Sequence, residues 1–233
     1  DTDDLNGFVK SVKKLMDRDS IFFFETFYLY SQIKNFVWDF TYHEHYSYFT
    51  IKPLTIFFKK HGMEIIDLKK NNTKGGSIRV VVQLIGGSRK VKKIVKSLMM
   101  KERQMKVQTE VGFKKYSNKI NNGKKNFLSF FDKIKSKKIA GYGASATSTT
   151  LIYHYKINKY LNYLVDDFKA KQNLYSPGFH IPVFSPKKLF TDKPDYLIIL
   201  AWRYHKKILS KIRNKLKKGT KIIIPLPKFK ILN

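Results

Sequence analysis

The sequence predicts an α/β protein whose carboxy-terminal part is a small, doubly wound domain. Short apolar runs alternate with amphipathic helical patterns along most of the chain, and strands that alternate with helices favour a parallel sheet. In residues 137–167 an apolar run, a glycine-rich loop, a helical pattern and a second apolar run follow one another. That order is typical of a β-α-β unit that can hold a mononucleotide.

The first elements of the chain are predicted to be a helix and a strand. Apolar residues recur at helical spacing over residues 5–16, and Asp3 or Asp4 can cap the start of that helix. Residues 21–24 form a continuous apolar run. Such a run predicts a short strand that is buried on both faces.

A second helix and a strand pair follow. Pro53 suits the first turn of a helix, and Gly62 is placed to end it after His61, which we interpret as a C-terminal cap. Residues 63–68 and 78–84 have strand patterns. The polar, glycine-containing turn between them makes an antiparallel hairpin the expected arrangement.

Residues 89–136 are mainly helical in pattern and strongly basic, with a predicted interruption at Asn121-Asn122-Gly123. We interpret them as a solvated helical bridge, and an electrostatic partner surface is the alternative. The expected organisation is therefore a first domain in residues 1–88, a bridge in residues 89–136 and a second domain in residues 137–233. In the second domain, strands are also predicted at residues 196–201 and 221–224, on either side of a basic helix.

The charge of the chain is unusual. Its 47 basic and 17 acidic residues give a formal net charge of +30, which favours anionic partners. Only six of the basic residues are arginine, the preferred residue for phosphate and guanine contacts, and the lysines are spread over the whole chain. We therefore expect an anionic small molecule rather than nucleic acid as the partner.

Cysteine is absent, which excludes disulfides and thiolate metal sites. No apolar run reaches the length of a membrane span and no signal peptide is visible, so we expect a cytoplasmic protein. The chain opens on Asp1-Thr2-Asp3-Asp4 without methionine, directly before a helical pattern. We expect it to be a fragment of a longer protein.

The stretch from Asp39 to Tyr46 holds the candidate catalytic residues. His45 is the best base, because an imidazole has a pKa close to working pH and can take and release a proton. Glu44 could act directly or orient a partner, and Tyr42 could donate to a developing oxyanion. Two alternatives remain open: a polar loop that satisfies its own hydrogen bonds, and a metal site, for which this spacing is the less convincing pattern.

Residues 141–146 form a G-x-G-x-x-A loop between a strand and a helix. Gly141, Gly143 and Ala144 would let the backbone and the helix start approach a phosphate, and Asp166, at the end of the next strand, could hold a ribose hydroxyl. The alternative is that the glycines serve only a tight turn. A further turn, Pro177-Gly178-Phe179-His180-Ile181-Pro182, leads to an edge segment.

Several local motifs follow one another along nearly the whole chain. They are Asp-Asp-Leu at residues 3–5, Phe24-Glu25, Tyr42-His43-Glu44-His45 with Ser47-Tyr48-Phe49, Gly75-Gly76-Ser77-Ile78-Arg79, Gly141-Tyr142-Gly143-Ala144, Val165-Asp166-Asp167, the turn at residues 177–182, and Leu200-Ala201-Trp202. In this order they resemble one known family, the sugar C-methyltransferases that act on nucleotide-linked keto-sugars.

The resemblance implies a fold and a reaction. Residues 1–88 resemble the second half of a class I methyltransferase sheet, which ends in a reversed hairpin, and residues 137–233 would be a Rossmann-like domain. In such a family His45 is the base that removes the proton beside the sugar ketone, and the enolate attacks the methyl group of S-adenosylmethionine. Tyr42 and Glu44 would orient the sugar and stabilise the enolate. The second domain would help to hold the nucleotide-sugar, through Gly141, Gly143, Ala144, Asp166, Gly178 and His180.

The chain also departs from the family pattern. Family members carry a cysteine-rich zinc module and then a cofactor-binding half, and neither has a counterpart here. The resemblance therefore implies that the S-adenosylmethionine site lies mostly outside this chain and that the fragment alone is inactive. Lys74 stands where histidine is expected, and Phe179 where threonine is common. The alternative function is a standalone nucleotide or nucleotide-sugar binding module without catalysis.

Overall fold

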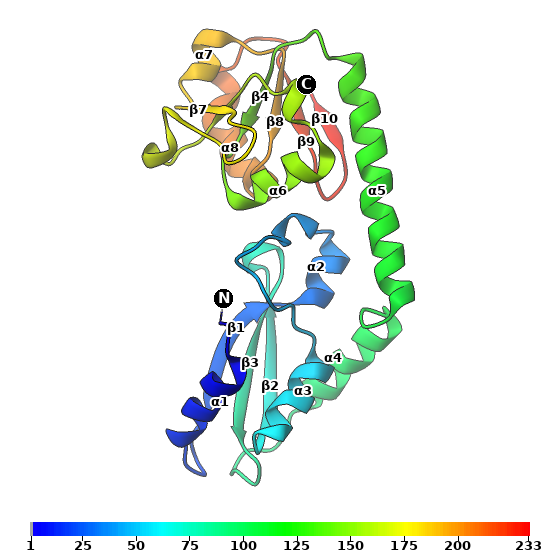
Figure 1. Ribbon diagram of the computed structural model, residues 1–233, viewed down its shortest axis with the longest axis vertical. Helices are drawn as coiled ribbons and strands as arrows, with labels where there is room; N and C mark the ends of the chain where they lie inside the picture. The colour runs from blue at the N-terminus through cyan, green and yellow to red at the C-terminus, as the bar shows by residue number, and fades with distance from the viewer. Residues whose placement is uncertain (1) are drawn as a thin grey trace. The chain divides into compact units, whose positions relative to one another are not determined.

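The computed structural model describes residues 2–233, so Asp1 lies outside the described residues. The chain forms two compact units (Figure 1). The first comprises the residues up to Phe36 together with His43–Ser117, and the second comprises Val37–Tyr42 together with Asn118–Asn233. Residues 89–136 are thus divided between both units. The three-part domain division expected from the sequence stays a prediction.

The first unit is built on a three-stranded sheet in the order β1-β3-β2, in which both outer strands run antiparallel to β3. This arrangement confirms the predicted hairpin and matches the reversed end of a methyltransferase sheet. The elements of the unit are α1 (Leu5–Lys14), β1 (Phe22–Phe27), α2 (Leu29–Asn35), α3 (Ile51–Lys60), β2 (Met63–Asn71), β3 (Ser77–Leu84), α4 (Lys93–Gln104) and the start of α5 (Glu110–Lys133).

Both predicted helix ends in this unit are confirmed. Asp4 is the N-cap of α1, where its Oδ1 accepts from the Gly7 amide at 2.8 Å. His61 is the C-cap of α3, and Gly62 follows it with φ +70°. Glycine suits this left-handed position because it has no Cβ.

The prediction that β1 is buried on both faces is wrong. Burial alternates along the strand, and Phe23 is 64% exposed. The strand pairs on one side only, with β3, and antiparallel strands can face solvent. Phe22 and Phe24 point to the covered face, where they meet Phe8 of α1 and Phe58 of α3. Helix α2, between β1 and the candidate loop, was not predicted.

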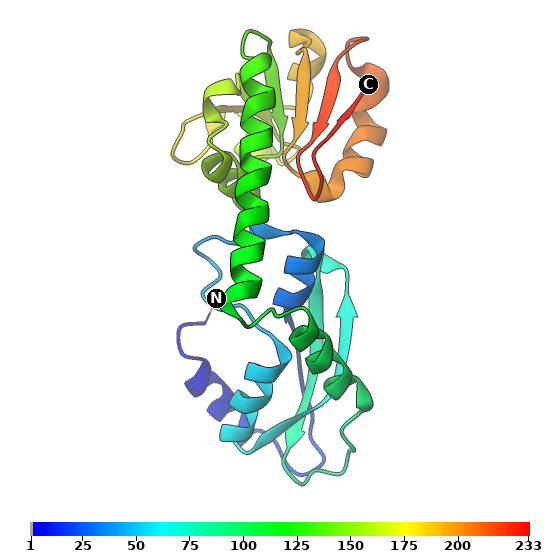
Figure 2. The ribbon, with the colours of Figure 1, turned by 90° about the vertical axis from the view of Figure 1, so that its right-hand side faces the viewer.

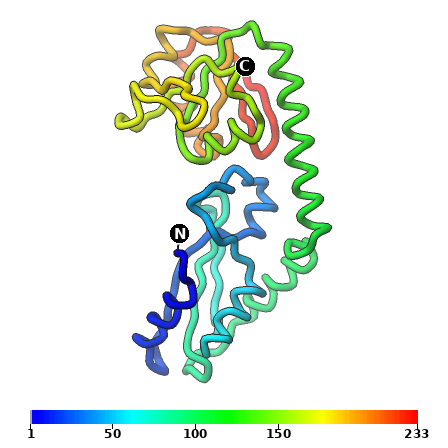
Figure 3. Tube along the Cα trace, in the orientation of Figure 1, coloured from blue at the N-terminus to red at the C-terminus, as the bar shows by residue number. Residues whose placement is uncertain are grey.

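The predicted helix break at residues 121–123 is also wrong. Helix α5 is continuous from Glu110 to Lys133 (green in Figure 3), and α4 and α5 are separated instead at residues 105–109. A Cβ on Gly123 would lie 2.7 Å from the Tyr155 hydroxyl, so this glycine serves a close approach. Phe127 and Phe131, both fully buried, supply the apolar contacts that outweigh the poor helix propensity of the Asn-Asn-Gly run.

The second unit is a seven-stranded sheet in the order β10-β9-β8-β4-β5-β7-β6, parallel except for its two edge strands. From β4 the chain winds outward through β5 and β7, then returns to β8 and β9 on the other side. This confirms the predicted doubly wound domain. Its elements are β4 (Ile139–Tyr142), α6 (Ala146–Tyr155), β5 (Tyr163–Val165), β6 (Leu174–Tyr175), β7 (Pro182–Phe184), α7 (Lys188–Asp192), β8 (Tyr196–Ile199), α8 (His205–Ile212), β9 (Lys221–Ile224) and β10 (Lys230–Leu232).

Strand β10 lies beside β9 at the sheet edge (Figure 2) and was not predicted from the sequence. The segment Val37–Tyr42 also packs within this unit and contains the 3-10 turn η1 (Trp38–Phe40). Its contacts in this unit are with residues more than 100 positions further along the chain. No local sequence pattern predicts such a contact.

Candidate active site

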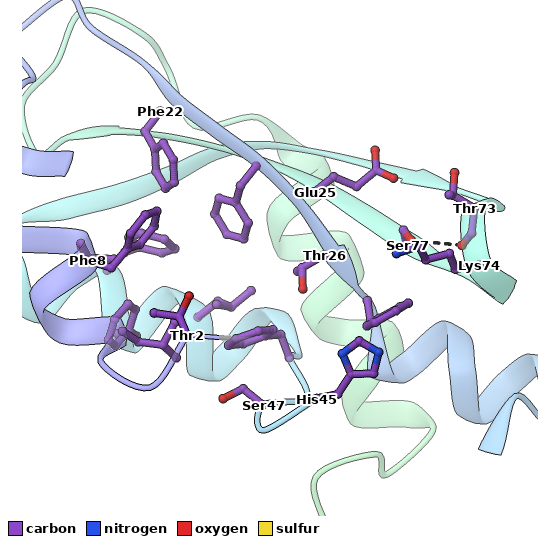
Figure 4. Close-up of a pocket in the computed structure, with 18 residues that line it drawn as sticks. Thr2, Phe8, Phe22, Glu25, Thr26, His45, Ser47, Thr73, Lys74 and Ser77 are labelled. Carbon is purple, nitrogen blue, oxygen red and sulfur yellow. Dashed lines mark hydrogen bonds between the residues drawn. The ribbon is translucent and has the colours of Figure 1, made fainter. Parts of the chain in front are cut away.

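A pocket of about 380 Å³ opens in the first unit among α1, β1, α3 and the two turns that flank them (Figure 4). Aromatic rings make up much of its wall, the aliphatic side chains of Leu5, Val9 and Leu54 add to it, and polar side chains occupy the remaining lining positions. The aromatic set is Phe8, Phe22, Phe24, Phe27, Phe49, Phe57 and Phe58, and the polar set is Thr2, Glu25, Thr26, His45, Ser47, Thr73, Lys74 and Ser77.

His45 lies at the carboxyl end of β1. Its ring packs edge-on against that of Phe27, the last residue of the strand, with centroids 4.4 Å apart and planes at 79°. Burial lowers the pKa of His45 below 6.5, and the charge of Lys74 lowers it further, while Glu44 opposes the shift. At neutral pH the imidazole is therefore mainly neutral, which is the form that accepts a proton.

The other two predicted catalytic residues lie on the same chain stretch. Glu44 is exposed. Tyr42 is half-buried, with its ring centroid 6.1 Å from that of Phe40. Tyr42 belongs to the second compact unit, whereas Glu44 and His45 belong to the first. The candidate loop thus crosses from one unit to the other between Tyr42 and His43.

The structure reveals a buried ion pair at the start of this loop, which the sequence did not single out. Asp39 is completely buried, and its two oxygens accept from Nη1 of Arg203 at 3.0 and 2.8 Å. Asp39 Oδ2 also accepts from Nε1 of Trp202 at 2.8 Å. Burial raises the pKa of Asp39, and Arg203 and Trp202 oppose the rise. The one signal in the sequence is a lone acid amid aromatic residues.

Close packing explains why glycine stands at the two glycine positions of the G-x-G-x-x-A loop. Gly141 lies inside β4, where a Cβ would meet Leu164 at 2.6 Å and Leu200 at 2.9 Å. Gly143 has φ +109°, and a Cβ there would come within 3.0 Å of Ala201. The positive φ of Gly143 fits the tight-turn interpretation, whereas Gly141 is needed because the sheet leaves no room for a side chain. The following helix α6 starts as predicted, with Ser145 as its N-cap.

The carboxylate of Asp166 closes this loop. Its Oδ2 accepts from the Ala144 amide at 2.7 Å, and its Oδ1 accepts from the Phe168 amide at 2.8 Å. Lys171 approaches the same carboxylate at 3.9 Å. The Ala144 N–H that would face a phosphate is therefore engaged by an acid of the chain itself. A phosphate at this amide requires the Ala144–Asp166 bond to open.

A crevice of about 250 Å³ lies at the carboxyl ends of β4, β5 and β8. This is where the winding of the sheet reverses, the usual place for a ligand in such folds. Of the predicted substrate-binding residues, Gly143 and Asp166 line it. The other lining residues are Tyr142, Asp167, Ala201, Tyr204, Lys207, Ile208 and Lys211.

Gly178 and His180 lie outside the lining of this crevice. A Cβ on Gly178 would stand 1.2 Å from the Tyr153 hydroxyl, and the Phe179 ring packs at a tilt of 31° against the same ring, with centroids 4.1 Å apart. His180 is exposed with φ +49°. The turn is thus fitted closely to α6.

Two properties concern the whole described range. Within residues 2–233, no group of three or more His, Asp or Glu side chains is placed to hold a metal ion. Over the same range, no helix combines the length and apolar character needed to cross a membrane.

Fold and site together define an α/β protein in which a methyltransferase-type sheet end precedes a Rossmann-like domain. The family model for the C-methyltransferase C-terminal domain matches residues 72–227, and the chain belongs to that family. C-methyltransferase NovU of Streptomyces niveus is 27% identical over 233 residues, which cover 99% of this chain and 56% of NovU. The chain thus spans little more than half the length of this relative. The resemblance to C-methyltransferases is confirmed.

Proposed function

We propose that the chain is the carboxy-terminal part of an S-adenosylmethionine-dependent C-methyltransferase that acts beside a ketone on a nucleotide-linked sugar or a similar substrate. The observation that carries the proposal is the position of His45. It lines an apolar-walled pocket at the carboxyl end of β1, in a setting that keeps the imidazole neutral. Membership of the C-methyltransferase family supports the reaction class.

The chemistry assigned to this chain is proton removal. His45 takes the proton from the carbon next to the ketone, and the electron pair of the C–H bond moves to the ketone oxygen to give an enolate. Tyr42 donates its hydroxyl proton to a hydrogen bond with the enolate oxygen. Glu44 orients the sugar and, through its charge, raises the basicity of His45. General base catalysis of this kind contributes about 10²- to 10⁴-fold to a rate.

In the second unit, whose glycine-rich loop joins a strand to a helix, Asp166 engages the Ala144 amide. We propose that the cofactor, which supplies the methyl group, is held mostly by residues outside this chain. The chain alone would then be inactive.

We assign the nucleotide-sugar to the second unit. The crevice at the reversal of the sheet brings Lys207 and Lys211 beside Gly143, and lysine charges attract the phosphates of a nucleotide. The proposed contacts are Gly141, Gly143, Ala144, Asp166, Gly178 and His180. Small conformational changes at Asp166 would open the Ala144 amide to a phosphate.

Proton exchange tests the proposal without the methyl transfer step. The full-length protein is incubated in D₂O with the keto-sugar nucleotide, and deuterium entry beside the ketone is followed by NMR. We expect His45→Gln to lower the exchange rate at least 100-fold, whereas the exposed neighbour variant His43→Gln exchanges at the parental rate. An undiminished rate in His45→Gln removes this residue from the role of base.

The alternative, a nucleotide-binding module without catalysis, is favoured by the doubly wound second unit and its crevice. Calorimetry with a nucleoside diphosphate and with a nicotinamide dinucleotide separates the two proposals. Tight binding of the dinucleotide would favour the module. Binding of the nucleoside diphosphate alone would favour the transferase.

A further inference from the structure

We propose that Tyr204 is the surface on which the base of a nucleotide stacks in the crevice of the second unit. The inference rests on the proposed function, which assigns the nucleotide-sugar to this crevice. The contacts named so far inside the crevice, with Gly143, Asp166, Lys207 and Lys211, serve the phosphates and the ribose, so the base still lacks a partner. Every residue that carries the inference belongs to the second unit.

The Tyr204 ring meets solvent inside a concave site. Tyr204 is 56% exposed, and among the described residues that line the crevice it is the one exposed aromatic side chain, because Tyr142 is 2% exposed. Aromatic side chains gain much from burying their faces, and a nucleotide base is a flat partner that can cover such a face. A ligand that brings a base into this crevice therefore finds an uncovered ring there.

The backbone on both sides of Tyr204 is held in place. Trp202 and Arg203 directly precede it, and both side chains donate to the buried carboxylate of Asp39, which lies in the same unit. On the other side, Nδ1 of His205 lies 2.7 Å from the Trp202 carbonyl oxygen. The chain that presents the ring is thus ordered before a ligand binds, which lowers the entropy cost of stacking.

The two lysines of the crevice follow Tyr204 along one face of α8. Lys207 and Lys211 come three and seven positions after Tyr204, a spacing that puts residues on the same side of a helix. At 1.5 Å per residue, they begin about 5 and about 10 Å further along the axis. Lys211 lies 3.7 Å from Asp167, and both side chains are more than half exposed, so this weak pair leaves the cation available. A ligand with a base at one end and phosphates at the other can meet ring and cations together.

A buried hydroxyl in the crevice is a separate sign of a ligand. Tyr142 lines the crevice, and its hydroxyl makes no hydrogen bond of ordinary geometry with the described residues, although Asp167 is close enough to act on it. A buried hydroxyl without an acceptor costs free energy, which a ligand recovers when it accepts the hydrogen bond. A ribose or phosphate oxygen is such an acceptor. The crevice thus combines an apolar ring, a hydroxyl donor and two cations, a set that fits a nucleoside diphosphate.

Calorimetry on the 233-residue chain tests the assignment with uridine diphosphate, adenosine diphosphate and inorganic pyrophosphate, which has no base. We expect Tyr204→Ala to weaken the binding of both nucleoside diphosphates at least about tenfold and to leave the affinity for pyrophosphate unchanged. The pyrimidine and the purine should behave alike, because stacking on an aromatic face does not require a particular base. Tyr204→Phe keeps the ring and should bind all three ligands within about twofold of the parent.

The matched control is Tyr175→Ala. Tyr175 is 67% exposed on β6 of the same unit and lies outside the lining of the crevice, so parental affinities are expected. Three results overturn the inference: an unchanged affinity of Tyr204→Ala for the nucleoside diphosphates, an equal loss for pyrophosphate, and a parent that binds them no more tightly than pyrophosphate. None of these results bears on His45 as base, which proton exchange in the full-length protein decides separately.

Discussion

The ammonium group of Lys74 lies 5.3 Å from the centre of the Phe27 ring, and His45 packs edge-on against the same ring. A cation and an imidazole thus share one aromatic partner at the end of β1. The arrangement places a positive charge close enough to His45 to depress its pKa, in addition to the effect of burial. It also gives Lys74 a defined electrostatic effect on His45.

Replacing Lys74 should raise the pKa of His45. In Lys74→Met the imidazolium no longer faces a nearby cation, whereas Glu44→Gln removes the acid that favours the protonated form and should lower the same pKa. An NMR titration of the His45 ring signals measures both shifts. The rate of proton exchange falls in acid as His45 becomes protonated. The pH at which this fall occurs should be higher in Lys74→Met and lower in Glu44→Gln. Shifts of the same sign in both variants would contradict this electrostatic account.

Removing the carboxylate of Glu102 should destabilise the first unit. Glu102 is 2% exposed and accepts from the Tyr28 hydroxyl at 2.8 Å and from the Ile51 amide at the start of α3 at 2.7 Å. Glu102→Ala leaves these donors buried without an acceptor, at a cost of about 3 kcal/mol. Urea unfolding measures the loss, and the exposed first-turn acid Glu110, changed to Ala, should cost less than about 0.5 kcal/mol.

The same carboxyl group should make stability depend on pH. Burial raises the pKa of Glu102 above 4.5, so the folded state binds the proton more tightly than the unfolded state does. Its contribution is therefore fully present below about pH 4.5 and falls as pH rises through the folded pKa. Glu102→Gln lacks this dependence, and the difference in unfolding free energy between parent and variant should be larger in acid than at pH 7. A difference that does not change with pH would be inconsistent with the raised pKa.

A substitution at Gly178 tests whether its turn requires glycine in order to pack against Tyr153. Gly178→Ala introduces a Cβ that overlaps the Tyr153 hydroxyl, at a residue with φ +76°. Gly219→Ala is the matched control, because Gly219 has φ +93° in the same unit with open space around it. We expect the control to lose about 1 kcal/mol from backbone strain and Gly178→Ala to lose at least about 2 kcal/mol. Thermal unfolding compares the two variants, and equal losses would show that the overlap is relieved without cost.

The sequence predicted local secondary structure better than contacts between residues that are distant in the chain. The strand, glycine loop and helix from Ile139 to Tyr155 were predicted because periodicity and turn residues lie within one short window. The burial of Asp39 was not, because it depends on Trp202, 163 positions further along the chain. The continuity of α5 was missed for the same reason: distant packing outweighs the weak helix propensity of Asn121-Asn122-Gly123. The contact of His45 with Phe27 at the end of β1 likewise needed the structure.

The acid that closes the glycine-rich loop gives a last prediction. Asp166 occupies the Ala144 amide and places a negative charge where a phosphate would bind. Asp166→Ala should therefore raise the affinity of the chain for inorganic pyrophosphate by about tenfold, or 1.4 kcal/mol. Pyrophosphate has no ribose, so the variant loses no ribose contact with this ligand. Calorimetry measures the change.

Asp167→Ala is the control for this last prediction. Asp167 lines the same crevice with its side chain 55% exposed, so its removal deletes one charge of the same sign without releasing the Ala144 amide. The gain should be clearly smaller than in Asp166→Ala. A nucleoside diphosphate in place of pyrophosphate tests whether the carboxylate also holds the ribose. If it does, the gain in affinity in Asp166→Ala should be smaller, because the variant loses the hydrogen bond to the ribose while it frees the Ala144 amide. A fall in pyrophosphate affinity would show that Asp166 orders the loop for the phosphate rather than closing it.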